Sequence, residues 1–175
     1  TWKFVTAGDA TTYAIRSDGS LWSWGWNEKG QAGNGVSERT ATPTLADGNR
    51  VWKKAVGGKA YGFFLAEDGS LWAAGTNESG VQGTNDGIDH KVLTRIGTDN
   101  DWADMACSRF WGYSGFAIKT NGTLWAWGEN SAGQLGIGYI QAQTAPVQVG
   151  ADMDWKQVAA GCSSVLALKT DGSLW

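Results

Sequence analysis

One five-residue stretch, Asp-Gly-Ser-Leu-Trp, recurs along the chain at a nearly constant interval. It occupies 18–22, 68–72 and 171–175, and the near copy Asn-Gly-Thr-Leu-Trp occupies 121–125. A tryptophan precedes each copy, and these opening tryptophans are spaced 50, 50 and 53 residues apart. A fixed period in this range indicates a fold built from tandem structural units. The predicted units are 2–51, 52–101, 102–154 and a shortened 155–175.

Every unit has the same internal order of two short apolar stretches, an Asp-Gly or Asn-Gly pair, and Leu-Trp. A two-residue type I′ turn needs positive φ at both positions, which Asn-Gly and Asp-Gly adopt most readily. Each pair is therefore predicted to form the turn of a β-hairpin. The predicted turn residues are Asp18, Gly19, Asp68, Gly69, Asn121, Gly122, Asp171 and Gly172.

The stretch before each turn is apolar on both sides of the strand that it predicts. In the first unit Tyr13 and Ile15 flank Ala14, and in the second Phe63 and Leu65 flank Phe64. Such a strand must be covered on both faces, as happens where antiparallel sheets stack face to face. The sequence thus predicts that the units stack on one another.

These features together predict an all-β fold, a β-propeller built from four-stranded blades of about 50 residues. The chain, 1–175, holds about three and a half such repeats and is predicted to form one partial propeller domain. An open β-rich array is the alternative architecture. Because propellers use about 4–8 blades, we expect the chain to be part of a longer propeller chain, with a homodimer as the alternative.

Composition and charge argue against several classes of function. The net charge is −3, and the 14 basic residues are scattered along the chain with no cluster larger than the pair Lys53 and Lys54, so no nucleic acid is expected as a partner. No apolar run approaches the ~20 residues of a membrane span, so no membrane contact is expected. His90 lies in a polar stretch and is predicted to be solvated, and Cys107 and Cys162 lack metal-ligand spacing. We therefore expect no catalysis, no cofactor and no metal.

The stretches after Leu-Trp carry a second set of shared motifs. The first unit reads SWGWNEKGQAGNG and the third AWGENSAGQLGIG, each followed by a threonine-containing loop and Pro43 or Pro146. Together with the hairpin, this order resembles the regulator-of-chromosome-condensation repeat. The resemblance implies a seven-bladed propeller and a role mainly in protein–protein recognition. The second unit departs from the pattern at Ala74, Val81 and Leu93, which stand where tryptophan, glutamine and proline would be.

A candidate binding site lies where the repeat is interrupted. Gly122 follows Trp102 by 20 positions, whereas the matching interval in the other units is 17. The added residues fall within SRFWGYSG, 108–115, which contains aromatic residues and an arginine, types common in interface hot spots. Their alternative role is to cover a blade edge. The candidate partner-binding residues are Arg109, Phe110, Trp111, Tyr113 and the non-repeated Trp26.

Three functions are compatible with these features. The leading hypothesis is a non-enzymatic module that recognises another protein through loops on one propeller face. A glycan-binding, lectin-like propeller is the first alternative, since aromatic rings stack on sugars. The second, implied by the family's founding member, is a guanine-nucleotide exchange regulator of a small GTPase, which would require a protruding hairpin insertion.

Overall fold

The structure, a computed structural model, describes residues 1–175 and contains fourteen β-strands in four antiparallel sheets. Three sheets have four strands, and the last has two. The strands are β1 (Trp2–Ala7), β2 (Thr11–Arg16), β3 (Leu21–Gly25), β4 (Thr40–Asp47), β5 (Trp52–Gly57), β6 (Tyr61–Ala66), β7 (Leu71–Gly75), β8 (His90–Arg95), β9 (Trp102–Cys107), β10 (Ser114–Lys119), β11 (Leu124–Gly128), β12 (Gln143–Gln148), β13 (Trp155–Ala160) and β14 (Val165–Lys169).

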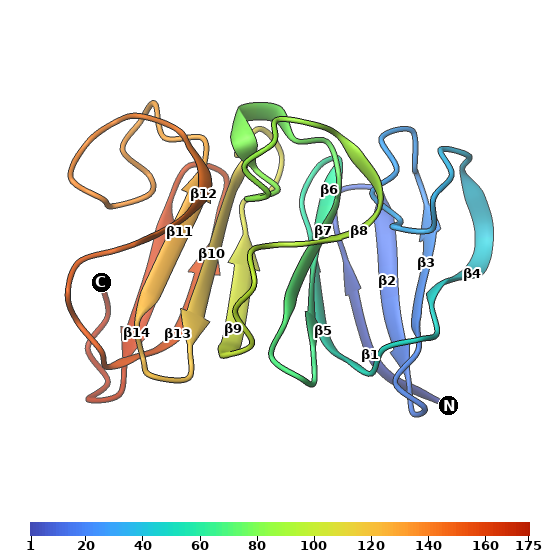
Figure 1. Cartoon of the computed structure of the whole chain (residues 1–175), viewed down its shortest axis with the longest axis horizontal. Helices are drawn as coiled ribbons and strands as arrows, with labels where there is room; N and C mark the ends of the chain where they lie inside the picture. Colours follow the sequence, from blue (N-terminus) through green and yellow to red (C-terminus); the bar gives the residue numbers. More distant parts are fainter.

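Within each sheet, consecutive strands are hydrogen-bonded neighbours, and the sheets stand side by side along the molecule (Figure 1). The first strands of adjacent sheets contact one another, β1 with β5, β5 with β9, and β9 with β13. We call these four the inner strands. The predicted all-β propeller is confirmed, as about three and a half blades that do not close into a ring.

The outermost strands carry both prolines, Pro43 in β4 and Pro146 in β12. Each of these strands pairs with one neighbour only, β4 with β3 and β12 with β11. Proline cannot donate a backbone hydrogen bond, so in sheets it is found mainly on edge strands. The position of each proline in the sequence is therefore explained by its place at the edge of a blade.

The hydrophobic core lies between the blades rather than within them. Every residue of β6 is buried, because its sheet is covered on both faces by neighbouring blades. The contact between the second and third blades includes Phe63, Ile96, Met105 and Trp127. The predicted burial of the second strands on both faces is therefore confirmed where a blade has two neighbours. In β14, Leu166 is 54% exposed because it lies on the last, two-stranded sheet.

The predicted turn type is wrong. Each Asp-Gly or Asn-Gly pair lies in a hairpin turn, but only its glycine has positive φ, 86° at Gly19 and 78° at Gly69. The Gly19 N–H donates to Arg16 O, and the Arg16 N–H donates to Ser20 O. The loop therefore has three residues and ends in a glycine bulge, a hairpin form next in frequency after the two-residue turns. The positive φ at the last loop position requires glycine. The aspartate before it does not adopt positive φ, so its recurrence needs another explanation.

The aspartate instead begins a hydrogen-bond relay that explains the whole pentapeptide. The Asp18 carboxylate accepts from the backbone N–H of Ser20 at 2.9 Å and from its hydroxyl at 2.6 Å. The Ser20 Oγ in turn accepts from the Trp22 indole N–H at 2.9 Å. The same relay occurs at 68–72, 121–125 and 171–175, with threonine replacing serine in the third. The relay fixes the tryptophan ring at the end of each hairpin.

A cation lies between two tryptophan rings at three of these hairpins. The Arg16 guanidinium is 3.9 Å from the Trp22 ring and 5.0 Å from the Trp2 ring. Lys119 and Lys169 occupy the matching positions in the third and fourth sheets. In the second sheet this position is Ala66, and Arg50 stacks on Trp72 at 3.9 Å instead. The cation thus joins the opening tryptophan to the hairpin tryptophan in the first, third and fourth sheets, and in the second sheet the Trp52 and Trp72 rings meet edge to face.

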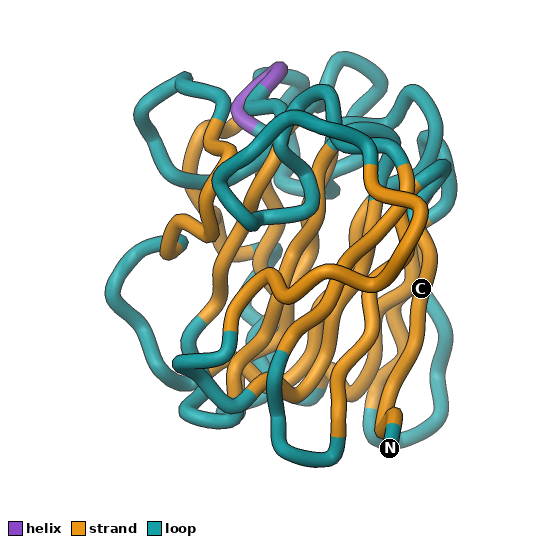
Figure 2. The backbone as a smooth tube through the Cα atoms, turned by 90° about the vertical axis from the view of Figure 1, so that its right-hand side faces the viewer, coloured by secondary structure: helices purple, strands orange, loops and turns teal.

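The strands run between two layers of loops (Figure 2). The hairpin turns form one layer. The other holds the short loops after the inner strands, which we call the inner loops (8–10, 58–60, 108–113 and 161–164), and the long loops 26–39, 76–89 and 129–142. The single helical turn η1 (Glu78–Gly80) lies in this second layer, at the upper end in Figure 1. No helix is long and apolar enough to cross a membrane.

The relay predicts an acid-sensitive stability. Hydrogen bonds from the Ser70 hydroxyl and backbone N–H lower the pKa of Asp68, and Asp18 and Asp171 are lowered in the same way. A lowered pKa stabilises the fold above the unfolded value, about 4, and this stability is lost as the pH falls through the folded value. Replacing Asp68→Asn, the residue type found at 121, should reduce the dependence of the unfolding free energy on pH below about 4.

Urea unfolding at several pH values measures this dependence. Glu38→Gln is the control, because it removes an exposed carboxylate that forms no side-chain hydrogen bond. An Asp68→Asn variant with the same pH dependence as the parent chain would contradict the assigned role of the aspartate.

Candidate functional site

The inner loop 108–113 contacts three other blades. The Arg109 N–H donates to Gly161 O at 3.2 Å, and the Phe110 N–H lies 3.4 Å from Asp9 Oδ1. A Cβ atom added to Gly112 would overlap the carbonyl oxygen of Cys162, so only glycine fits there. The loop therefore lies across the end of the inner strands and is held by the blades on both sides.

Tyr61 supports this loop from the second blade. Its hydroxyl lies 2.7 Å from Ser108 O and 3.0 Å from Gly112 O. Burial raises the pKa of Tyr61 well above its ordinary value, so the hydroxyl keeps its proton and donates it. The repeat pattern did not indicate this role. The available signal was that the first residue of β6 is a tyrosine, whereas β2 and β10 begin with the smaller Thr11 and Ser114.

The tip of the loop presents aromatic rings to solvent. Phe110 is 61% exposed and Trp111 is 73% exposed. The Lys59 ammonium lies 3.1 Å from the centroid of the Trp111 ring, which places a cation over one face of the indole. Phe110 has a φ of 55°, a strained conformation for a residue with a side chain. The loop thus holds two large apolar side chains away from the core.

The other predicted site residues lie at the same end of the strands. Tyr113 is half-buried, with its ring 6.1 Å from that of Tyr61, and its partial burial together with the Glu78 carboxylate raises its pKa. Trp26 is half-buried, and its backbone N–H donates to Ala10 O beside Asp9. Arg109, Phe110 and Trp111 form the exposed tip, whereas Tyr113 packs beneath it.

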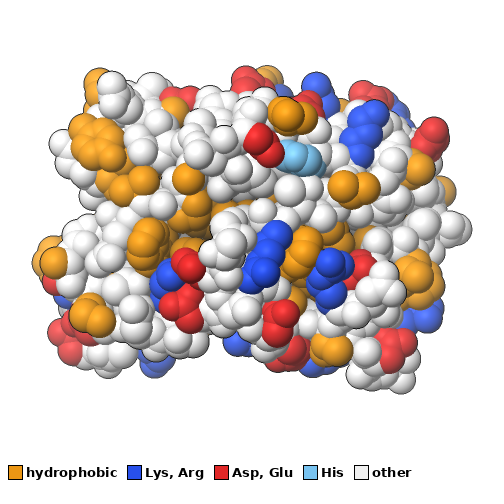
Figure 3. Space-filling view, in the orientation of Figure 1, with side chains coloured by type: hydrophobic (Ala, Val, Ile, Leu, Met, Phe, Trp, Pro, Cys, Tyr) orange, Lys and Arg blue, Asp and Glu red, His pale blue; other side chains and the backbone are white.

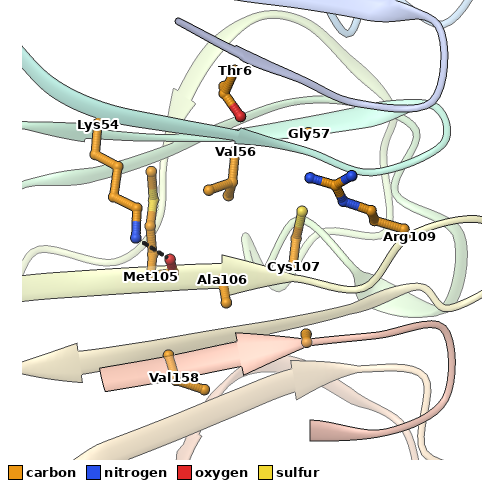
Figure 4. Close-up of a pocket in the computed structure, with 10 residues that line it drawn as sticks. Thr6, Lys54, Val56, Gly57, Met105, Ala106, Cys107, Arg109 and Val158 are labelled. Carbon is orange, nitrogen blue, oxygen red and sulfur yellow. Dashed lines mark hydrogen bonds between the residues drawn. The ribbon is translucent and has the colours of Figure 1, made fainter. Parts of the chain in front are cut away.

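A cavity of about 180 Å³ opens between the inner strands beneath this loop (Figure 4). Its wall combines side chains of β1, β5, β9 and β13 with Arg109, so four blades contribute to it. The Lys54 Nζ atom lies on this wall and donates to Asp104 Oδ1 at 2.5 Å and to Met105 O at 2.9 Å. No motif in the sequence indicated this cavity, because its residues come from four different units.

The long loops are ordered by the asparagine of the shared Trp-Gly-x-Asn motif. The buried Asn27 side chain accepts from Ala32 N and donates to Val36 O and Glu38 O. Asn77 and Asn130 accept in the same way from Gln82 N and Leu135 N. The long loops have little strand pairing, so these asparagine side chains supply hydrogen bonds that hold the loop backbone in place.

The prediction that His90 is solvated is wrong. Its side chain is 19% exposed, its Nδ1 atom lies 2.7 Å from Gln82 Oε1, and its Nε2 atom lies 3.2 Å from Asp86 Oδ2. The outer face that includes His90 has Lys/Arg and Asp/Glu side chains interspersed (Figure 3). No group of three His, Cys, Asp or Glu residues is placed to hold a metal ion.

Comparison with known proteins connects this geometry to a family. Residues 18–65 and 121–168 match the regulator of chromosome condensation (RCC1) repeat, and residues 2–31 match a second description of the same repeat. The chain belongs to the RCC1 repeat family. The resemblance inferred from the hairpin and glycine motifs is therefore confirmed.

Relatives of this RCC1-repeat chain include the ultraviolet-B receptor UVR8 of Arabidopsis thaliana, 30% identical over 163 residues, and human protein RCC2, 31% identical over 150 residues. These alignments cover 91% and 84% of the chain but 37% and 19% of the relatives. The solved structure of Prp20p from Saccharomyces cerevisiae matches with a TM-score of 0.83 at 19% identity, over 95% of this chain and 43% of that one. The chain thus spans less than half the length of these proteins.

Removing the Tyr61 hydroxyl should loosen the loop. In Tyr61→Phe, the buried carbonyl oxygens of Ser108 and Gly112 lose the single O–H group that lies within hydrogen-bond distance of both, which should lower the free energy of unfolding by about 1–2 kcal/mol. Hydrogen exchange of the 109–112 amides should also become faster. Urea unfolding and exchange mass spectrometry measure both effects. Tyr139→Phe is the matched control on an exposed tyrosine, and equal exchange in the two variants would contradict the role of Tyr61.

The two cysteines should differ sharply in reactivity. Burial raises the pKa of Cys107 to about 12, whereas Cys162 is exposed. Because the thiolate is the reactive form, iodoacetamide near pH 8 should modify one thiol in the native chain and two after unfolding. Mass spectrometry counts the labels. Cys162→Ser should leave the native chain unlabelled, and a labelled native Cys162→Ser variant would contradict the burial of Cys107.

Proposed function

We propose that this chain is a non-enzymatic module that recognises another protein through loops at one end of the propeller. The observation that carries the proposal is the loop 108–113, which holds Phe110 and Trp111 in solvent although apolar residues of this size are usually buried. Aromatic and arginine side chains are the types that contribute most energy at protein interfaces.

The construction of the loop supports recognition rather than covering of a blade edge. Phe110 retains positive φ, and strained backbone conformations gather at functional sites, where the surrounding structure holds them in place. Tyr61, Asp9 and Gly161 hold the backbone of the loop, so its tip is fixed before a partner arrives. Such preorganisation lowers the entropy lost on binding.

The relatives support a protein partner. Prp20p is described together with its binding to Gsp1p and histones, and Kap60 has been crystallised bound to the same yeast protein. The glycan alternative has less support, because Lys59 covers one face of the Trp111 ring and leaves a single face on which a sugar could stack. The nucleotide-exchange alternative is disfavoured because the third unit's extra residues form a short loop without strands.

Cross-linking tests the proposal even while the partner is unidentified. A photoreactive phenylalanine derivative placed at Trp111 should capture a protein from an extract of the source cells, and Arg109→Ala should reduce the yield. The same derivative at Tyr139, which is 47% exposed on another loop, should capture much less. Equal capture at the two positions would contradict the proposed surface.

Once the partner is identified, Trp111→Ala should weaken its binding by about 2 kcal/mol, roughly thirtyfold, as expected for an interface hot spot. The thermal unfolding midpoint should not change, because Trp111 is 73% exposed. Isothermal titration calorimetry and circular dichroism measure the two quantities. An unchanged affinity would show that Trp111 does not contribute to partner binding.

A further inference from the structure

The cavity between the inner strands has an unused positive group on its wall. Arg109 is exposed, and its guanidinium forms no hydrogen bond or ion pair within the chain. In Figure 4 this group points from the loop across the cavity toward Gly57, above the Cys107 sulfur. Lys54, the other cation of the wall, is already paired with Asp104 at 2.5 Å. The cavity therefore offers one guanidinium without a partner in the chain.

Apart from the two cations, most residues of the wall have apolar side chains. Val56, Met105, Cys107 and Val158 line it, and the Thr6 hydroxyl, which forms no hydrogen bond within the chain, faces it from β1. A ligand that fits this wall needs a hydrocarbon part as well as a negative charge. An aspartate or glutamate side chain has both, whereas a free phosphate ion has no apolar part and favours several cations.

A further basic side chain, Lys59 on an inner loop, lies at the same end of the inner strands as Arg109. Lys59 lies over the Trp111 ring and forms no ion pair with a carboxylate of the chain. The carboxylates nearby are Asp104, which pairs with Lys54, Asp9, near the Phe110 N–H, and Glu78, beside Tyr113. Arg109 is thus the cation of the cavity wall that has no carboxylate partner in the chain.

We propose that this cavity is a carboxylate-binding site, which receives an aspartate or glutamate side chain of the protein segment docked on loop 108–113. This inference rests on the proposed function and names the chemistry of its partner. Arg109 binds the carboxylate through the paired N–H groups of its guanidinium, and the Thr6 hydroxyl is placed to donate a further hydrogen bond. The apolar wall contacts the hydrocarbon stem of the acidic residue.

The two methionines of the chain allow a direct test, because only one of them lines the cavity. Met105 is on the wall, and Met153 is 62% exposed elsewhere. In a chain labelled with ¹³C at the methionine methyl groups, NMR shows one signal for each, assigned with Met153→Leu. The probes are the acetylated, amidated peptide Leu-Glu-Leu, its Leu-Gln-Leu counterpart, and inorganic phosphate.

The glutamate peptide should shift the Met105 signal in a saturable way and leave the Met153 signal in place, and the glutamine peptide should shift neither. Arg109→Ala should weaken the binding about ten- to hundredfold, the range for a hydrogen bond to a charged group. Arg109→Lys should retain part of it. Arg39→Ala is the control with the same change of charge, on an exposed side chain that pairs with Glu28 outside the cavity.

Three results would overturn the inference. They are no Met105 shift at millimolar glutamate peptide, an equal shift with Arg109→Ala, and a shift with phosphate but not with the glutamate peptide, which would make the site one for phosphate. Trp111→Ala separates this inference from the proposed function. Trp111 does not line the cavity, so the variant should keep the Met105 shift even if it loses the protein partner.

Discussion

The structure depends on the burial of each blade against its neighbours. A four-stranded antiparallel sheet has two faces, and in this chain the second strand of a blade is apolar on both of them. Such a sheet cannot be stable alone, because one apolar face would remain in water. The buried apolar side chains accordingly form three clusters, one at each contact between successive blades; Tyr13 meets Phe64 in the first, and Phe63 meets Trp127 in the second. Stability is therefore a property of the stack and not of a unit.

The hairpin motif also holds the large tryptophan ring in one orientation near the beginning of a short strand. Indole N–H groups that are partly buried need an acceptor. The Ser or Thr hydroxyl provides it, and the Asp or Asn side chain orients that hydroxyl. The spacing of two residues from serine to tryptophan follows from the strand geometry, because residues i and i+2 lie on the same face.

The fold could be predicted from the sequence because each of its signals is local and occurs several times. The hairpins, the doubly apolar strands and the glycine motifs all recur within one unit. The turn type was wrong because Asp-Gly serves two turn geometries, and the relay that favours aspartate becomes visible only with side-chain positions. His90 was wrongly placed because its partners, Gln82 and Asp86, depend on the path of one irregular loop.

The candidate site could be predicted only in part. The interruption of the repeat marked 108–115, and the structure gathers Arg109, Phe110 and Trp111 at its tip. The cavity beneath the loop and the role of Tyr61 could not be inferred, since they require knowing which strands of different units meet. The repeat pattern in the sequence identifies residues that the units share. The cavity and the support of the loop depend instead on contacts between different units, which the pattern does not show.

Loop 108–113 belongs to the third blade, but the Tyr61 hydroxyl that supports it belongs to the second. The two blades must therefore be kept together for the loop to keep its conformation. If a repeat of this chain were copied or exchanged, the third unit moved elsewhere would lose the hydroxyl beneath its loop. Only a pair of consecutive repeats carries the loop together with its support. A segment that transfers this surface to another chain, in evolution or by design, must therefore contain two consecutive repeats and not one.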